Sequence, residues 1–129
     1  MPVIRTTLAA LATAAAVGAV LAPAATASPA THLTISVYEP LSPVLRQYEL
    51  TCDPVGGTHP RAKEACEAIT ASPGNIKPVP PTANCYDRVY GPQRAKVTGV
   101  LLGATVTAEF SRVNSCEEAR WQRWLPVWG

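Results

Sequence analysis

Alternating apolar and polar positions open the folded part of the chain and predict extended strands. Residues 32–38 alternate strictly, which is the pattern of a strand with one buried face. The apolar side of this run consists of Leu33, Ile35 and Val37. Pro40 and Pro43 then break the pattern, and residues 44–52 resume it. The spacing therefore predicts two neighbouring antiparallel strands.

A helical period replaces the alternation in residues 61–70. Residues 53–57 combine proline with two glycines, which is turn chemistry. We expect Thr58 or His59 to cap the helix, with Pro60 in its first turn. A Ser-Pro-Gly sequence ends the helix. The inward face of the helix is predicted to carry Ala62, Cys66 and Ile69.

The second half of the chain predicts an extended crossing and a hairpin. Residues 72–81 contain four prolines, so we expect this segment to cross the surface in extended form. Residues 95–102 and 104–110 are typical of two strands joined through Leu102-Gly103. These strands would complete an antiparallel sheet.

Three tryptophans lie close to the C-terminus, at positions 121, 124 and 128. The first interval suits one face of a helix, and Pro126 prevents that helix from continuing. We expect the three rings to cover the core or an interface. An exposed platform for sugars is the alternative, which no neighbouring polar pattern supports.

The N-terminus has the composition of an export signal. Arg5 is its only charge, residues 8–22 are mostly apolar, and Ala25-Thr26-Ala27 offers a small-residue cleavage site. The apolar stretch is shorter than a membrane span. We therefore expect a signal peptide over residues 1–27, a secreted domain over residues 28–129, and no membrane contact after cleavage.

The charge of the predicted mature domain argues against two classes of partner. The chain has 11 basic residues, of which Arg5 lies in the predicted signal, so ten remain against nine acidic residues. A nearly neutral domain lacks the basic surplus that nucleic acids and anionic membranes attract. We expect neither partner, and a domain of about 100 residues has room for one core.

All four cysteines lie in the predicted mature domain, at positions 52, 66, 85 and 116. An even number of cysteines in an exported chain indicates two disulfides, although spacing alone leaves three pairings open. No Cys-x-x-Cys pair is present and the chain has only two histidines, which does not match structural zinc sites. We predict neither a metal nor another cofactor.

Catalytic chemistry is not predicted for this chain. A hydrolase needs a nucleophile, a base and an orienting acid, and Asp53 and His59 could be combined with a serine. No Gly-x-Ser-x-Gly motif marks such a serine. Each cysteine is assigned to a disulfide. We therefore expect a binding protein rather than an enzyme.

Four blocks of sequence resemble the Streptomyces-type subtilisin inhibitor family. They are LTCDPVGGTHP at 50–60, VYGP at 89–92, VTGV at 97–100 and NSCE at 114–117. The first block is long and specific, and the resemblance covers nearly all of the predicted mature domain.

The resemblance implies a fold, a function and two disulfides. Members of the family are secreted bacterial inhibitors of serine proteases, and they form homodimers through their sheets. The implied fold is α+β, with two layers, a five-stranded antiparallel sheet and two short helices. The implied pairs are Cys52 with Cys66 and Cys85 with Cys116. The implied partners are serine proteases of trypsin or subtilisin type and a second copy of the chain.

The reactive bond is predicted at Arg88-Val89. The family has three residues between the loop cysteine and the Tyr-Asp-Pro that follows, whereas this chain has four between Cys85 and Tyr90. Counting back from Tyr90 selects Arg88-Val89, and counting forward from Cys85 selects Asp87-Arg88. We favour Arg88-Val89 because a guanidinium can pair with the carboxylate of a trypsin-like specificity pocket, whereas burying an aspartate is unfavourable.

The resemblance also assigns roles around this bond. Asn114 matches the family position whose side chain hydrogen-bonds the loop backbone, and a cap on the turn before Cys116 is the alternative. Gly91 replaces the usual aspartate, which could loosen the loop. Because of these departures, a secreted binding module that has lost inhibition is the alternative function. The predicted protease-binding loop around the bond comprises Cys85, Tyr86, Asp87, Tyr90, Gly91 and Pro92.

Overall fold

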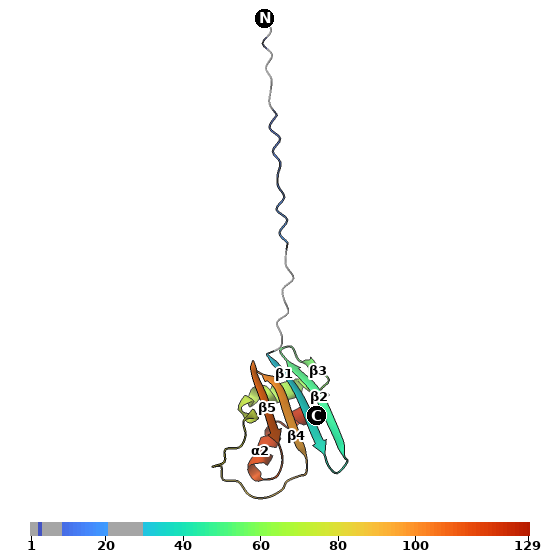
Figure 1. Cartoon of the computed structure of the whole chain (residues 1–129), viewed down its shortest axis with the longest axis vertical. Coiled ribbons are helices and arrows are strands. Elements are labelled where there is room, and N and C mark those ends of the chain that lie inside the picture. Colours follow the sequence, from blue (N-terminus) through green and yellow to red (C-terminus); the bar gives the residue numbers. More distant parts are fainter. Residues whose placement is uncertain (1–2, 4–8, 21–29) are drawn as a thin grey trace.

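The computed structural model of the chain describes residues 3, 9–20 and 30–129 (Figure 1). The predicted cleavage site after residue 27 lies outside the described residues. Residues 9–20 form neither helix nor strand. Within these described ranges, no helix has the length and apolar character needed to cross a membrane.

One layer of the domain is an antiparallel sheet of five strands with the order β3-β2-β1-β4-β5. The central strand β1 pairs with β2 from Thr31↔Cys52 to Glu39↔Val44, and it pairs with β4 on its other side. Strands β4 and β5 form the predicted hairpin. The strands are β1 (Thr31–Glu39), β2 (Val44–Cys52), β3 (Gly56–Gly57), β4 (Arg94–Leu101) and β5 (Ala104–Phe110).

The alternation of β1 explains its central place in the sheet. Leu33, Ile35 and Val37 are fully buried on the inner face. The side chains between them point to the outer face, because successive residues of a strand alternate. The two predicted strand pairs and the antiparallel sheet are confirmed.

The second layer is helical and covers the inner face of the sheet (Figure 1). It comprises α1 (Ala62–Ala71), η1 (Pro73–Ile76), α2 (Ser115–Arg123) and η2 (Leu125–Trp128), where η denotes a short 3-10 helix. The expected α+β class, with five strands, two helices and two layers, is confirmed. The implied disulfides are confirmed as well, with Cα–Cα distances of 5.8 Å for Cys52–Cys66 and 5.4 Å for Cys85–Cys116.

The start of α1 differs from the prediction. The helix begins at Ala62, and Thr58 does not cap it, because the Thr58 hydroxyl accepts a hydrogen bond from Glu49 N at 2.9 Å. His59 Nδ1 accepts from Arg61 N at 2.9 Å, so Nε2 carries the proton and donates to Val127 O at 2.9 Å. Both ring nitrogens of this buried histidine are therefore used structurally.

The proline-rich segment is not extended throughout, because residues 73–76 form η1. Backbone hydrogen bonds from Asn75 N to Ser72 O and from Lys77 N to Gly74 O form this turn, and a buried arginine that the sequence pattern does not reveal binds its carbonyls. Arg120 is 5% exposed, and it donates to Asn75 O at 2.9 Å, Ile76 O at 3.0 Å and Glu109 O at 2.6 Å. Its guanidinium stacks on Phe110 at 3.8 Å from the ring centroid. Arg120 therefore holds the carbonyls of η1 in a tight turn against β5.

The C-terminal tryptophans form the centre of the core. Trp121, Trp124 and Trp128 are all buried, and Trp124 packs on Phe110 with ring centroids 5.4 Å apart. The indole N–H groups of Trp124 and Trp128 donate to backbone carbonyls, so burial leaves neither unpaired. The expected core role is confirmed, and an exposed sugar platform is wrong because these rings do not face solvent.

Trp124→Ala is expected to lower the free energy of unfolding by about 3 to 5 kcal/mol, because it leaves a large cavity under the sheet. Leu125→Ala is the matched control, since Leu125 is the next residue and is half exposed. Its effect should stay within about 1 kcal/mol. Urea unfolding followed by far-UV circular dichroism measures both variants. Equal losses would contradict the central role of Trp124.

Candidate functional site

A long segment without helix or strand connects η1 to β4 and carries the predicted reactive bond. It spans residues 77–93, and Figure 1 shows it leaving the body of the domain near the start of β4. Tyr86 and Val89 are 80% and 67% exposed, and Asp87 and Arg88 between them are exposed as well. A large partner can therefore reach this backbone from solvent.

The side of the loop that precedes Arg88 is tied to the first turn of α2. Tyr86 N donates to Ser115 Oγ at 2.7 Å, and Ser115 N donates to Tyr86 O at 3.0 Å. The disulfide Cys85–Cys116 joins the neighbouring residues covalently. Two hydrogen bonds and one crosslink therefore fix the loop at Tyr86.

The side that follows Val89 is tied to the segment between β5 and α2. Tyr90 N donates to Arg112 O at 2.7 Å. The span between the two fixed points contains three residues, Asp87 to Val89, with Arg88 in the middle. The geometry thus places Arg88 at the centre of an exposed arch, by which we mean residues 86–90. The two feet of the arch are Tyr86 and Tyr90, which are bonded to the scaffold.

A tight turn shortens the arch on the side of Cys85. Arg88 N donates to Tyr86 O at 2.9 Å, which closes a three-residue turn around Asp87. This turn lies between Cys85 and Arg88, where the chain has one residue more than the family pattern. The Arg88 guanidinium lies 5.2 Å from the centroid of the Tyr90 ring, within the range of a cation–π contact.

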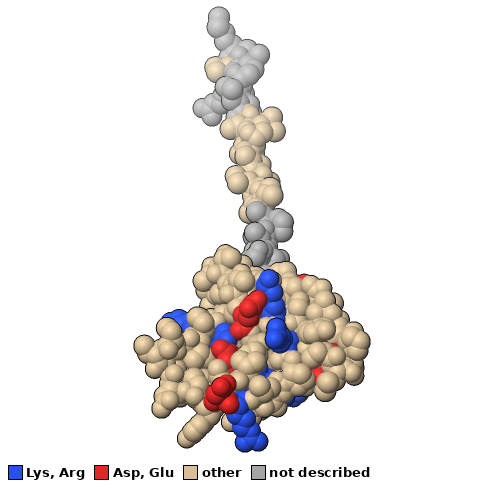
Figure 2. Space-filling model, turned by 60° about the horizontal axis from the view of Figure 1, so that its bottom comes forward, with Lys and Arg blue, Asp and Glu red and all other residues tan. Residues whose placement is uncertain are grey.

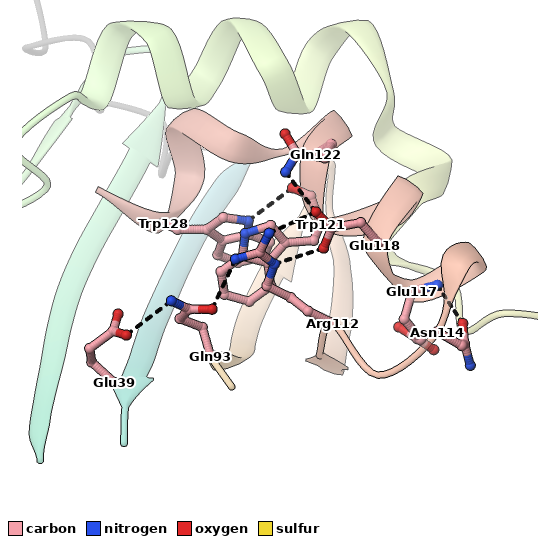
Figure 3. A network of polar contacts seen from close by, with 9 residues as sticks. All are labelled: Glu39, Gln93, Arg112, Asn114, Glu117, Glu118, Trp121, Gln122 and Trp128. Atoms are coloured by element: carbon pink, nitrogen blue, oxygen red, sulfur yellow. Dashed lines mark hydrogen bonds and ion pairs between the residues drawn. The ribbon is translucent and has the colours of Figure 1, made fainter. Parts of the chain in front are cut away.

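A polar network lies behind the second foot of the arch (Figure 3). Arg112 donates through Nε and Nη2 to the two carboxylate oxygens of Glu118 at 2.7 and 2.8 Å. Its Nη1 donates to Gln93 Oε1 at 2.9 Å, and Gln93 Nε2 donates to Glu39 Oε1 at 3.0 Å. Gln122 Nε2 donates to Glu118 Oε1 at 2.9 Å. The network connects the loop to β1 and α2.

The ion pair between Arg112 and Glu118 shifts the pKa values of both groups. Its side chains are 21% exposed for Arg112 and 13% exposed for Glu118. The hydrogen bonds from Arg112 lower the pKa of the Glu118 carboxyl, and the hydrogen bonds to Glu118 raise the pKa of the Arg112 guanidinium. Both groups are therefore held in their charged forms.

Gly91 lies beside the ends of the Arg112 and Gln93 side chains, which a Cβ at this position would have to displace. A Cβ placed on Gly91 would come within 2.6 Å of Arg112 Nη1 and would also overlap Gln93 Oε1. The space that a larger residue would occupy is filled by the guanidinium. The glycine that departs from the family pattern therefore allows a close contact in this structure.

Asn114 caps α2 in the structure. Its Oδ1 accepts from Glu117 N at 2.9 Å, which satisfies one of the free N–H groups at the start of the helix. The capped turn carries Ser115 and Cys116, which are the residues that contact the loop. A direct hydrogen bond from Asn114 to the loop backbone stays a prediction.

Charges of both signs are interspersed on the face shown in Figure 2. Lysine and arginine side chains alternate with aspartate and glutamate there, and no broad region has a single sign. This face of the described residues therefore lacks the one-sided basic field typical of nucleic-acid-binding surfaces.

The sequence model of the family described as subtilisin inhibitor-like matches residues 27–115. The chain belongs to the subtilisin inhibitor-like family. Subtilisin inhibitor-like protein 1 of Streptomyces cacaoi is 34% identical over 80 residues, which cover 59% of this chain and 73% of that protein. A protein of Streptomyces avermitilis is 36% identical over 67 residues, which cover 52% of this chain and 45% of that protein.

A solved structure, Streptomyces caespitosus sermetstatin in complex with Bacillus licheniformis subtilisin, is also similar. The sequence identity is 25% and the TM-score is 0.49, and the match covers 76% of this chain and 96% of that chain. The subtilisin inhibitor-like family is a family of protease inhibitors and not of enzymes, which confirms the expectation that the chain is not an enzyme.

Two loop-supporting residues, Ser115 and Arg112, were not predicted from the sequence. Ser115 lies inside the NSCE block, so its place beside the loop cysteine was an available signal. Arg112 carries no motif, and its partner Glu118 is six residues away across the cap of α2. No helical or strand spacing predicts such a pair, because the two residues belong to different local structures.

Glu118→Gln should reduce stability in a pH-dependent way. Since the folded state lowers the pKa of Glu118, its ionised form stabilises the fold above the unfolded pKa of about 4.3, and this stabilisation is lost as the pH falls through the lower folded value. The difference in unfolding free energy between wild type and Glu118→Gln should therefore be large near neutral pH and shrink in acid. Urea unfolding across that range measures it.

Glu67→Gln is the matched control, because Glu67 is an exposed glutamate of α1. It should change the unfolding free energy little at any pH. A stability advantage of wild type over Glu118→Gln that persists undiminished at a pH where Glu118 is protonated would contradict the electrostatic account of the Arg112–Glu118 pair.

Proposed function

We propose that the chain is a secreted inhibitor of serine endopeptidases and that it offers Arg88-Val89 as a substrate-like bond. The observation that carries this proposal is the exposed arch with both feet held. Tyr86 is tied to Ser115 and Tyr90 is tied to Arg112. Asp87, Arg88 and Val89 are left open to solvent between them.

Such an arch suits inhibition by the physics of substrate binding. A protease binds a segment of backbone beside its own strand, and a segment that is already ordered loses little conformational entropy when it docks. After cleavage, the Cys85–Cys116 bridge would keep the new carboxyl end in place. The new amino end at Val89 would stay near it, so religation competes with hydrolysis.

The charge and position of Arg88 favour a trypsin-like target. Its guanidinium is exposed at the centre of the arch and can form a charge-assisted bidentate pair with a pocket carboxylate. The turn around Asp87 absorbs the extra loop residue before Arg88, which supports counting the reactive bond back from Tyr90. Subtilisin-like proteases, whose pockets accept apolar side chains, are the second target class.

One observation favours the alternative, a binding module on the same scaffold without inhibitory activity. Arg88 N already donates to Tyr86 O within the loop. A protease that needs this N–H for its own backbone pairing must first open the turn around Asp87. A loop that resists this opening would bind a different partner or none.

The proposed location is extracellular. Two disulfides are typical of proteins that fold in an oxidising compartment. We therefore assign residues 1–27 to a signal peptide and residues 28–129 to the inhibitor domain.

We also propose a homodimer through the outer face of the sheet. Tyr38 and Leu45 are paired in register on this face and are 44% and 63% exposed. Apolar side chains exposed next to each other on an otherwise uncovered sheet face suit a self-complementary contact.

Sedimentation equilibrium of the mature protein is expected to give twice the monomer mass. Replacing Leu45 with Glu should shift the equilibrium to monomer, because two like charges would meet across a twofold axis. Val55→Glu, an exposed apolar residue in the turn between β2 and β3, is the control and should leave the dimer intact. A wild-type protein that sediments as a monomer would refute the dimer.

The mature protein should inhibit trypsin with a Kd of about 10 nM or tighter. Arg88→Met should weaken trypsin inhibition by about 100-fold or more, because the charge-assisted pair is lost, while subtilisin inhibition is kept or improved. Titration of both enzymes with a chromogenic substrate measures this, and mass spectrometry identifies the bond that is cut.

Arg61→Met is the control, because Arg61 is an exposed arginine at the start of α1, away from the loop. It should leave both inhibition constants unchanged. Unchanged trypsin affinity in Arg88→Met would exclude Arg88-Val89 as the reactive bond. Lack of inhibition of either enzyme by the wild type would favour the binding module.

A further inference from the structure

Arg112 contacts the part of the loop that follows Val89 in three ways. Its carbonyl accepts from Tyr90 N at 2.7 Å. Its Nη1 donates to Gln93 Oε1 at 2.9 Å. Its guanidinium also fills the space beside Gly91 that a Cβ would otherwise occupy. One residue therefore bonds the loop backbone at Tyr90 and a loop side chain at Gln93, and its guanidinium lies where a Cβ of residue 91 would be.

Arg112 is itself held by the scaffold (Figure 3). Glu118 of α2 accepts two hydrogen bonds from the guanidinium at 2.7 and 2.8 Å. The guanidinium also lies 5.8 Å from the centroid of the buried Trp121 ring. A bidentate pair to a largely buried carboxylate fixes both the position and the plane of the guanidinium. The residue is therefore a rigid support rather than a mobile surface arginine.

We propose that Arg112 is a positioning residue for religation of the reactive bond. This inference rests on the function proposed above and names the group that holds the leaving end of the loop. After cleavage, the segment that ends at Arg88 is held by the disulfide at Cys85. The segment that begins at Val89 enters β4 only at Arg94. Between these points, the contacts of Arg112 hold the released strand.

The chemistry of the step shows why this position matters. In cleavage, the serine oxygen of the protease forms an ester with the carbonyl carbon of Arg88, the amide bond to Val89 breaks, and the proton of the serine is transferred to the leaving nitrogen. In religation, the Val89 amine attacks that ester carbon, the amide reforms and the serine hydroxyl is released. Water attacks the same carbon in the competing hydrolysis. An amine that is held in place competes better than a free one.

Gly91 and Arg112 complement each other in this role. The family pattern has aspartate where this chain has Gly91, and a side chain there would push the Arg112 guanidinium and the Gln93 side chain apart. The glycine therefore removes a steric obstacle to the support, which compensates for the freedom that glycine gives to the backbone.

Arg112→Gln tests the proposal in the mature protein with trypsin. We expect the initial inhibition constant to weaken, because a less ordered loop loses more conformational entropy when it docks, but by a smaller factor than the persistence of inhibition, because no group that enters the protease changes. We expect inhibition to decay about tenfold or more faster, with a matching rise in the fraction cleaved at Arg88-Val89 at equilibrium. Arg123→Gln is the control, because Arg123 contacts Asn75 Oδ1 at 3.4 Å and not the loop. Equal decay in Arg112→Gln and wild type would overturn the proposal.

Gly91→Ala provides a second test that keeps every charge. The added methyl group meets the far ends of two flexible side chains, Gln93 and Arg112, so the fold can adjust by separating them, which breaks their hydrogen bond. It should therefore also accelerate cleavage, although Arg112 is present. If Arg112→Gln fails to fold, as judged by its thermal unfolding, Gly91→Ala alone decides: accelerated cleavage supports the proposal, and a wild-type rate overturns it.

Amide hydrogen exchange separates this proposal from the function on which it rests. A wild-type protein that inhibits neither protease refutes the proposed function, and the variants then lose their inhibition readout. The Tyr90 amide still reports on the support, because its acceptor is Arg112 O. Faster exchange at Tyr90 in Gly91→Ala and Arg112→Gln than in wild type would support the ordering role, and equal exchange would overturn it.

Discussion

The packing of the C-terminal tryptophans under the sheet is the interaction on which the rest of the structure depends. Trp121, Trp124 and Trp128 seat α2 and η2 on the inner face of β1 and β5. The family match ends at residue 115, so this part of the core is built from residues beyond the match. Since the first turn of α2 carries the loop contacts, burial of indole rings determines where the exposed arch stands.

Two arginines then connect that core to the loop, by different means. Arg120 is buried among backbone carbonyls that lead into the loop, and its burial lowers the pKa of its guanidinium although Glu117 opposes this shift. Arg112 holds the other side through a carboxylate, which raises its pKa. Arg120 fixes the path of the backbone because it binds main-chain carbonyls. Arg112 is held by Glu118 and contacts the loop from behind, so the outer side of the loop stays open to solvent.

The loop combines exposure at its centre with restraint at its ends. The contacts with the scaffold, two sets of hydrogen bonds and a disulfide, lie at Cys85, Tyr86 and Tyr90, so the residues between Tyr86 and Tyr90 remain accessible. This division suits a bait segment, because a partner can surround the centre while the ends keep their positions. Gly91 and the turn around Asp87, which depart from the family pattern, both lie within or beside the restrained parts.

The local sequence predicted the elements whose pattern repeats over a few residues. The alternation around Leu33 gave rise to the prediction of β1, and the spacing of Cys66 and Ile69 predicted the buried face of α1. The spacing of the cysteines, in contrast, left three pairings open, and only the family resemblance implied the pairing that the structure contains. The position of Arg88 in the loop also came from that resemblance together with the chemistry of its charge.

Tertiary structure alone decided the contacts between residues that are distant along the chain. The partners of Arg120 in η1 are 44 and 45 residues away along the chain. Thr58 does not cap α1 as predicted, because its hydroxyl is bonded to Glu49 N of β2. Hydrophobic period is a property of neighbouring residues and is therefore visible in the sequence. Hydrogen bonds between distant segments depend on how packed elements meet in space, and no local pattern encodes that meeting.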